Sequence, residues 1–380
     1  MKIFAAKETK RGEQRVALTP SVVEKLVQLG AHVSVERGFG QSVNWDDASW
    51  ESAGAEVKQD SKDGYAQADI VVSLNPPEPT VLDHLNHNAI LISFFDPFDN
   101  TQLVSALARK RLSGLCMELI PRTTYAQKMD ALSSQASLAG YAAVLIAAER
   151  INKVLPMMTT PAGTIAPGRV FVIGVGVAGL QAIATAKRLG ARVEAYDTRP
   201  VVEEQVRSLG ARFVKIDVGE TGQTEQGYAK ALTEEQLERQ RRQMARYCAN
   251  SDIVITTAQV FGRRAPRIVT DDMIAGMKPG SVVVDLAAST GGNVEGTVVD
   301  QEVLRHGVLL VGNGNFAGEV ALDASQMYAS NVFNLIAHAW DKEAARLVLD
   351  PEDDVIGTCL LTHEGDIRHP GIREAVEGST

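Results

Sequence analysis

A glycine-rich turn in the middle of the chain has the residue types and spacing that bind a dinucleotide. The motif Gly174-Val175-Gly176-Val177-Ala178-Gly179 follows an expected strand, 169–173, and opens an expected helix, 180–189. The first glycine permits a tight turn, the second lets a pyrophosphate approach the backbone, and the third allows close packing of helix on strand. Amides at the helix N-terminus favour the phosphates. A turn of this kind can also serve sheet geometry alone, but here strand, glycines and helix are in register.

An acidic residue follows where the next strand of such a unit ends. Asp197 lies about 18 residues further on, and its carboxylate can accept hydrogen bonds from both ribose hydroxyls of NAD. Because the same charge repels a 2′-phosphate, the sequence predicts NAD rather than NADP. Arg199 leaves this choice open, since its guanidinium can stack on adenine or pair with a 2′-phosphate. The predicted cofactor contacts here are Gly174, Gly176, Val177, Gly179, Asp197, Thr198 and Arg199.

A polar loop at 121–135 gathers a cation, an amide, a carboxylate and hydroxyls just after an expected strand, 115–119. Polar groups at strand ends are where α/β sheets place their ligands. A solvated loop that caps the following helix is an equally good reading of the composition alone.

These segments together resemble the NAD(H)-binding component (domain I) of the proton-translocating nicotinamide nucleotide transhydrogenases, a family that shares its fold with alanine dehydrogenase. The resemblance rests on the polar loop, the glycine motif and the run 181–190, and it extends from 15–20 to 357–359. The loop is more specific than the glycine motif.

The resemblance implies roles for particular side chains. In the loop, Arg122, Gln127 and Asp130 form a functional set with Ser133 beside them. Hydride transfer needs no acid or base, so these groups would orient the nicotinamide carboxamide in a dry site. Further nucleotide contacts implied by the family are Gly227 and Tyr228, on a loop that closes over the nucleotide, and Gln240, Ala258 and Gln259.

The chain also departs from the family pattern. Phe261-Gly262-Arg263-Arg264-Ala265-Pro266 replaces a proline-rich turn, and Ala317 replaces a proline. Alanine dehydrogenases need a cationic clamp for the substrate carboxylate and a proton carrier for imine chemistry. Arg15 is retained, but the lysine of that site falls on Asn75, its histidine on Asp96 and a nearby acid on Ser289.

Length and alternating apolar segments predict an α/β protein with two Rossmann-like doubly wound parallel sheets joined by two long helices. The expected domains are 1–132 plus 322–380, and 133–321 with six parallel strands. Ser133, Ser134 and Gln135 are expected to cap one long helix reaching to about 154, and the other is expected over 323–340.

Charge and composition narrow the function classes. With 38 Lys and Arg against 47 Asp and Glu, the formal charge of −9 disfavours nucleic acid. Three separated cysteines fit a reducing compartment, and neither they nor the histidines have metal-ligand spacing, so no metal is assigned. The charged N-terminus does not resemble a signal peptide, and the uninterrupted apolar runs are shorter than the ~20 residues of a membrane span.

The sequence therefore predicts a homodimeric component that binds NAD(H) and passes hydride to NADP+ on a partner subunit. The resemblance further implies a membrane proton-channel subunit and a cytoplasmic location, peripheral on the inner membrane. Two alternatives stay open: a self-sufficient NAD-dependent alanine or amino-acid dehydrogenase, and a non-catalytic NAD(H)-binding module.

Overall fold

The computed structural model describes residues 1–216 and 233–378. They form two compact units, one built from 1–135 with 320–380 and the other from 136–319. The chain passes from the first unit to the second within helix α5 (Ala131–Arg150) and returns just before helix α10 (Ala321–His338).

Unit 1 is built on an eight-stranded sheet of order β19-β18-β6-β5-β4-β1-β2-β3. The six strands from β6 to β3 run parallel, and β18 pairs antiparallel with β6 and β19. The strands are β1 (Lys2–Ala5), β2 (His32–Glu36), β3 (Glu56–Lys58), β4 (Ile70–Val72), β5 (Ile90–Ser93), β6 (Ser113–Cys116), β18 (Leu360–His363) and β19 (Asp366–Ile367).

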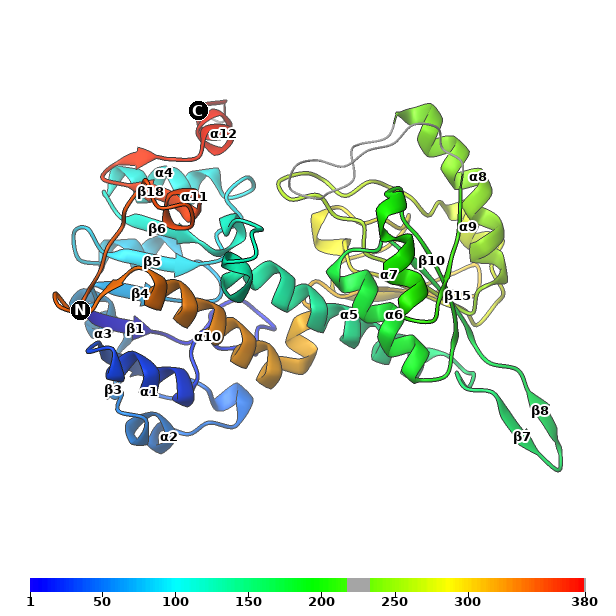
Figure 1. Cartoon of the computed structure of the whole chain (residues 1–380), viewed down its shortest axis with the longest axis horizontal. Coiled ribbons are helices and arrows are strands. Elements are labelled where there is room, and N and C mark those ends of the chain that lie inside the picture. Colours follow the sequence, from blue (N-terminus) through cyan, green and yellow to red (C-terminus); the bar gives the residue numbers. More distant parts are fainter. Residues whose placement is uncertain (217–232, 379–380) are drawn as a thin grey trace. The chain divides into compact units, whose positions relative to one another are not determined.

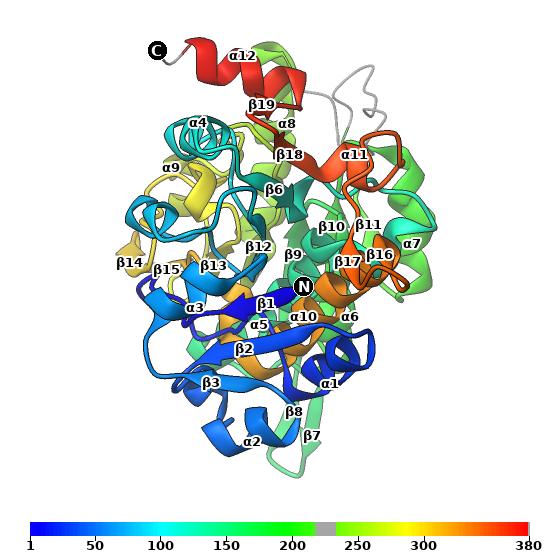
Figure 2. The ribbon, with the colours of Figure 1, turned by 90° about the vertical axis from the view of Figure 1, so that its left-hand side faces the viewer.

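Helices pack around this sheet because its central strands are apolar along almost their whole length: every residue of β4 and β5 is buried. Figure 2 shows the strands of unit 1 with their helices around them. The helices are α1 (Pro20–Gln28), α2 (Asp47–Ser52), α3 (Ser61–Gln67), α4 (Thr101–Arg109), α10, α11 (Ile356–Cys359) and α12 (Pro370–Gly378), and a short pair, β16 (Trp340–Asp341) with β17 (Arg346–Leu347), follows α10.

Unit 2 has a seven-stranded sheet of order β11-β10-β9-β12-β13-β15-β14, parallel except for β14. Its strands are β9 (Arg169–Ile173), β10 (Arg192–Tyr196), β11 (Arg212–Phe213), β12 (Ile253–Thr256), β13 (Val282–Asp285), β14 (Gln301–Arg305) and β15 (Val308–Gly312). Its other helices are α6 (Val177–Arg188), α7 (Glu203–Ser208), α8 (Glu234–Asn250) and α9 (Asp271–Ala275).

Two apolar cores cover the two faces of this second sheet. Alternate β9 residues enter different cores: Val170 and Val172 pack with α5, α6 and α7, whereas Phe171 and Ile173 pack with α8 and α9. The contact between α5 and α6 is tight, since a Cβ on Gly140 would lie 2.1 Å from the Ala178 carbonyl oxygen. The doubly wound arrangement predicted from sequence is confirmed.

Several expected elements differ in detail. The second sheet was expected to hold six parallel strands, but β14 adds an antiparallel edge strand, Gln301–Arg305, whose polar, exposed residues hide its pattern. The strand expected at 115–119 is instead Ser113–Cys116, followed by a 3₁₀ turn. The helix expected at 323–340 is Ala321–His338, and the C-terminal hairpin begins only at Leu360, after α11.

The start of α5 also differs from expectation. The helix begins at Ala131, and the side chain of Asp130, rather than the hydroxyls of Ser133 and Ser134, caps its first turn. Asp130 accepts hydrogen bonds from the Ser133 amide at 2.9 Å and the Ser133 hydroxyl at 2.6 Å. A carboxylate at this position also suits the positive end of the helix dipole.

Among the described residues, α5 is the one helix that is long and apolar enough to cross a membrane by length and composition. Counting only uninterrupted apolar residues missed it, because serines and a glutamine interrupt its sequence. Ala143, Val144 and Ala147 of this helix are buried in the core of unit 2. Core helices of water-soluble proteins have the same composition, so this is weak evidence for a membrane span.

Candidate functional site

The glycine-rich turn joins β9 to α6, as the motif predicts. Gly174 has a φ of 95°, and a Cβ on Gly179 would lie 2.0 Å from the Gly174 carbonyl oxygen, so both positions need glycine for the fold itself. Gly176 differs. It is exposed, has an ordinary φ of −86°, and a Cβ there would meet no described atom within 4 Å. The open space at the N-terminus of α6 is what an approaching phosphate requires.

Asp197, at the end of β10, faces this turn. Its Oδ2 accepts a hydrogen bond from the Val175 amide at 2.7 Å, and its Oδ1 accepts from the Arg199 amide at 2.8 Å. The Arg199 guanidinium grips the same carboxylate through Nε and Nη2, both at 2.9 Å, and Nη2 also donates to the Val175 carbonyl at 3.1 Å. These hydrogen bonds raise the pKa of Arg199. The cation that left cofactor choice open is therefore neutralised by the neighbouring carboxylate.

Gln240 lies on the inner face of α8 and is buried. Its Nε2 donates to the Tyr196 hydroxyl at 3.0 Å, but its Oε1 has no hydrogen-bond partner among the described residues. A buried acceptor without a donor is costly, and such atoms often mark a ligand site. Thr198 lies beside Asp197 in the loop after β10. Gly227 and Tyr228 lie outside the described residues.

Ala258 and Gln259 follow β12, at the same carboxyl edge of the sheet as the glycine turn. Asn293, which is fully buried, holds the backbone of Ala258 on both sides: its Oδ1 accepts from the Ala258 amide at 3.0 Å, and its Nδ2 donates to the Ala258 carbonyl at 2.9 Å. Gln259 is exposed and donates to the Leu286 carbonyl at 2.9 Å. Sequence reasoning missed Asn293; the signal available was a polar residue directly after the Gly291-Gly292 pair.

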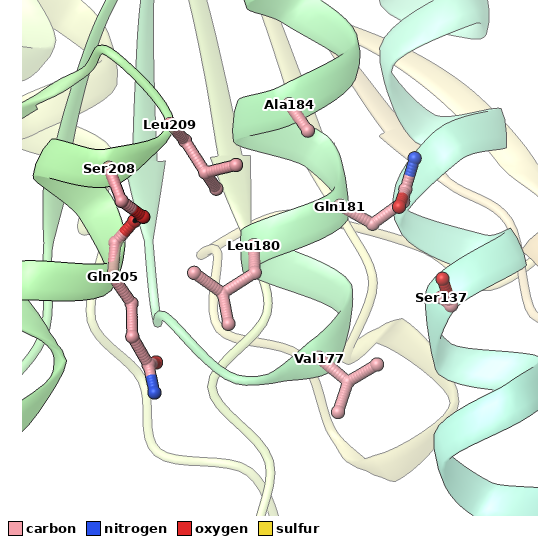
Figure 3. Close-up of a pocket in the computed structure, with 8 residues that line it drawn as sticks. All are labelled: Ser137, Val177, Leu180, Gln181, Ala184, Gln205, Ser208 and Leu209. Atoms are coloured by element: carbon pink, nitrogen blue, oxygen red, sulfur yellow. Dashed lines mark hydrogen bonds between the residues drawn. The ribbon is translucent and has the colours of Figure 1, made fainter.

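A groove runs along the outer side of α6. Figure 3 shows Leu180 facing α7 and Gln181 facing Ser137 of α5, with Val177 at the start of the helix. Val177 is a predicted cofactor contact, yet the glycines of the turn and Asp197 do not line this groove. Its lining is mostly apolar, so it is unsuited to phosphates.

The polar loop of unit 1 packs differently from the glycine turn. The Gln127 side chain is exposed and makes no hydrogen bond within the described chain, and Arg122 is exposed on the same loop. Asp130 and Ser133 bond to each other at the start of α5. Both the capping role and the presentation of polar groups to solvent, which were alternatives in the sequence, occur together.

The carboxyl edge of the unit 1 sheet is filled by the chain's own side chains. Glu8 accepts hydrogen bonds from the Leu74 amide at 2.6 Å and the Asn75 amide at 3.0 Å. Glu13 forms a two-pronged ion pair with Arg15, at 2.8 and 2.7 Å, and both side chains are largely buried. Burial raises the pKa of Glu8; it opposes the shift at Glu13, whose pKa the hydrogen bonds from Arg15 nevertheless lower.

A second buried glutamate repeats this arrangement one strand away. Glu118, which follows β6, accepts from the Phe95 amide at 3.1 Å and the Asp96 amide at 2.6 Å. Burial raises the pKa of Glu118. The backbone donors at the ends of β4 and β5 are thus satisfied from within unit 1.

The fold and these two edges define a class: a two-domain α/β protein with a Rossmann-type dinucleotide turn in its second domain. Models of the alanine dehydrogenase/PNT family match the chain, the N-terminal domain over residues 4–139 and the C-terminal domain over 143–370. The chain belongs to this family.

Relatives and solved structures support the assignment over the whole length. The chain is 42% identical over 379 residues to the first of the polypeptides that make up NAD(P) transhydrogenase subunit alpha in Rhodospirillum rubrum, with 98% of this chain and 99% of the relative covered. It is 41% identical to the protein of the same name from Rickettsia prowazekii, covering 100% and 99%. The crystal structure of transhydrogenase from Sinorhizobium meliloti matches with a TM-score of 0.84 and 41% identity, covering 98% and 100%.

Proposed function

We propose that this chain is the NAD(H)-binding component of a proton-translocating transhydrogenase, and that it delivers hydride from NADH to NADP+ held by another subunit. The observation that carries the proposal is the open backbone at Gly176, at the N-terminus of α6 and next to the Asp197 carboxylate. That geometry suits a pyrophosphate and an unphosphorylated ribose. Full-length similarity to proteins named NAD(P) transhydrogenase subunit alpha supports the reaction class.

The reaction demands orientation rather than acid or base chemistry. A hydride leaves C4 of the dihydronicotinamide and joins C4 of the acceptor ring, so two electrons and one hydrogen nucleus move together and no solvent proton is consumed. We propose that Gln127, Arg122, Asp130 and Ser133 orient the nicotinamide. Gln127 is suited to this task, because its exposed amide has no partner within the described chain.

The ion pair between Asp197 and Arg199 supports NAD(H) as the nucleotide. A 2′-phosphate would have to approach a carboxylate that is largely buried, and the adjacent guanidinium is already bound to that carboxylate. Ribose hydroxyls can instead donate to the carboxylate. Arg199 therefore favours NADP only if Asp197 is removed.

The contacts of Arg15 disfavour a self-sufficient amino-acid dehydrogenase. Its Nε and Nη2 bind Glu13 and its Nη1 donates to Gln135 at 2.8 Å, so its charge is already neutralised before a substrate carboxylate arrives. Asn75, where a lysine would be needed, donates to Glu8 and Glu13. An anionic substrate would have to displace an internal carboxylate from a partly buried pair.

We further propose that the chain works with an NADP(H)-binding subunit and a membrane proton-channel subunit, at the cytoplasmic face of the inner membrane. We propose a homodimer. Supporting the latter, a hairpin of β7 (Met158–Thr160) and β8 (Gly163–Ile165) extends from unit 2 with every residue exposed, including Met158 and Ile165 (Figure 1). An isolated two-stranded hairpin is marginally stable in water, so a second copy that covers it would stabilise it.

The test compares three reactions of the purified chain. NADH binding is measured by titration, and hydride transfer is measured with NADP+ alone and after addition of the NADP(H)-binding subunit of a related transhydrogenase. We expect NADH binding alone and transfer only with the added subunit. Turnover of alanine with NAD+ and no partner would show a dehydrogenase instead, and binding without chemistry in any mixture would show a non-catalytic module.

The dimer is tested separately. Light scattering of the parent is compared with a variant in which residues 158–165 are replaced by a glycine and serine linker. We expect a dimeric parent and a weaker dimer in the variant; a monomeric parent would contradict the proposed assembly.

A further inference from the structure

Helix α10 carries a polar stripe on the side that faces the loop of residues 122–130. Its members are Asn331, Asn334 and His338, which follow one another at intervals of three and four residues and therefore share one face of the helix. Asn331 and His338 are largely buried, although polar. A buried polar stripe on a helix that otherwise packs apolar side chains needs partners, and its partners lie in that loop.

Two of these residues hold the same backbone atom. The Nδ2 atoms of Asn331 and Asn334 both donate to the Lys128 carbonyl oxygen, at 2.9 and 3.1 Å. Lys128 lies between Gln127 and Asp130. Asn331 also accepts a hydrogen bond from the Ser134 hydroxyl at 2.7 Å, so one amide joins the loop to the first turn of α5.

The third residue holds the other end of the loop. The Tyr125 hydroxyl lies 3.0 Å from Nδ1 of His338, and Nε2 of His338 lies 2.9 Å from the Asp353 carboxylate. Because a carboxylate only accepts, Nε2 carries the proton of the neutral ring, and Nδ1 accepts from Tyr125. Asp353 is itself fixed by the Val355 and Ile356 amides, at 2.9 and 2.8 Å.

We propose that Asn331, Asn334 and His338 are positioning residues that hold the loop in the conformation hydride transfer requires. The proposal rests on the proposed function, because the loop carries Gln127. The stripe binds residues 125 and 128, which flank Gln127, and leaves the Gln127 side chain exposed. Fixing the backbone on both sides of an orienting amide reduces the conformations it must lose when the nicotinamide binds.

The clamp itself is tested without any activity measurement. Hydrogen exchange is measured at the Ala126 and Asp130 amides, which bond to the Thr123 and Gln127 carbonyls within the loop. In Asn331→Ala/Asn334→Ala we expect these amides to exchange about tenfold faster, as a locally opened segment does. Gln326→Ala, an exposed substitution on the same helix, should leave exchange unchanged. Unchanged exchange in the double variant would overturn the clamp.

The positioning role is tested by separating rate from affinity. With the NADP(H)-binding subunit present, the double variant should transfer hydride about tenfold more slowly, with NADH affinity within about twofold of the parent. Tyr125→Phe and His338→Gln should each slow transfer by about threefold, and combining them should add little, because they break one chain of contacts. His338→Asn, whose amide reaches the Nδ1 position, should recover the rate.

The outcomes separate the two proposals. A parent that shows no transfer with the partner contradicts the proposed function, while the exchange experiment still decides the clamp. Faster exchange with an unchanged transfer rate would overturn the positioning role, and so would loss of rate in proportion to loss of NADH affinity.

Discussion

The two sheets of this protein present the same kind of edge and use it in opposite ways. In unit 2 the carboxyl edge leaves the backbone at Gly176 open, next to a helix N-terminus. In unit 1 the corresponding edge is filled from within: Glu8 binds the Leu74 and Asn75 amides, and Glu118 binds those of Phe95 and Asp96. The difference shows that a doubly wound sheet does not by itself specify a nucleotide site.

What distinguishes the two edges is whether the backbone donors already have an anionic partner. A carboxylate that occupies a strand end supplies the negative charge that a phosphate would otherwise bring. Glu13 extends this to Arg15, whose cation is neutralised internally. The comparison leads to substitutions that should close the open edge or disturb the filled one.

The largest effect is expected from closing the open edge. Gly176→Val places a branched side chain where a Cβ meets no described atom, so the chain should still fold, with at most about 1 kcal/mol lost at the helix cap. NADH affinity should fall about 1000-fold, or about 4 kcal/mol, because the pyrophosphate loses its backbone approach. Isothermal titration with NADH measures this.

A graded control accompanies it. Gly176→Ala should weaken binding less, whereas Gly179→Ala should impair folding, since its Cβ would lie 2.0 Å from the Gly174 carbonyl oxygen. Equal NADH affinity in the parent and the valine variant would show that the nucleotide does not approach this turn.

The next effect comes from disturbing the filled edge. Glu13→Gln leaves the Arg15 guanidinium partly buried without its carboxylate, and should lower the free energy of unfolding by about 3 kcal/mol at pH 7. The pKa of Glu13 is lowered in the fold, so its contribution is present above the unfolded value near 4.5 and is lost as the pH falls through the folded value.

Urea unfolding at several pH values measures this difference. Parent and variant should converge as the pH falls below about 4.5. A difference that grows on acidification would have the wrong sign for an ion pair.

A smaller effect is expected at the amino edge of the unit 2 sheet, away from the glycine turn. Asp252 accepts from the Arg169 amide and from Lys153, each at 2.8 Å. Burial opposes the shift, but these hydrogen bonds and Lys278 lower the pKa of Asp252. Asp252→Asn should cost about 2 kcal/mol of stability at neutral pH and leave NADH affinity unchanged. Loss of affinity there would blur the distinction between the two edges of the sheet.

The smallest effect is a change of nucleotide preference. Asp197→Asn removes the ribose acceptor and frees the Arg199 guanidinium, so NADH affinity should fall about tenfold while NADPH affinity rises. Adding Arg199→Ala should abolish the gain for NADPH. If NADPH affinity does not rise in the single variant, Arg199 has no access to a 2′-phosphate. Fluorescence titration with each nucleotide measures both values.

Much of the fold and part of the site could be predicted from sequence. The turn at Gly174 to Gly179 and the acid at Asp197 were predicted because their chemistry depends on local spacing, and the structure places them together. The buried strands were equally readable, because strands covered on both faces are apolar nearly throughout. β14 escaped prediction because an exposed edge strand lacks that pattern.

Contacts between distant segments could not be predicted. Asn293 holds Ala258 from 35 residues away, and Asn331 reaches Lys128 across 203. A single asparagine in a helix carries no periodic signal, so nothing in the chain marks it as a partner of that loop. The roles proposed for Arg122, Gln127, Asp130 and Ser133 stay predictions until the transfer rates are measured.

The sequence by itself determined the two doubly wound sheets and the dinucleotide turn, since hydrophobic period and glycine spacing are local properties of the chain. Only the tertiary structure decided that Glu13 neutralises Arg15, that Asp197 neutralises Arg199 and that Gly176 stays open. The physical reason is that the charge available to a ligand depends on which opposite charge lies within about 3 Å, and folding alone brings those atoms together.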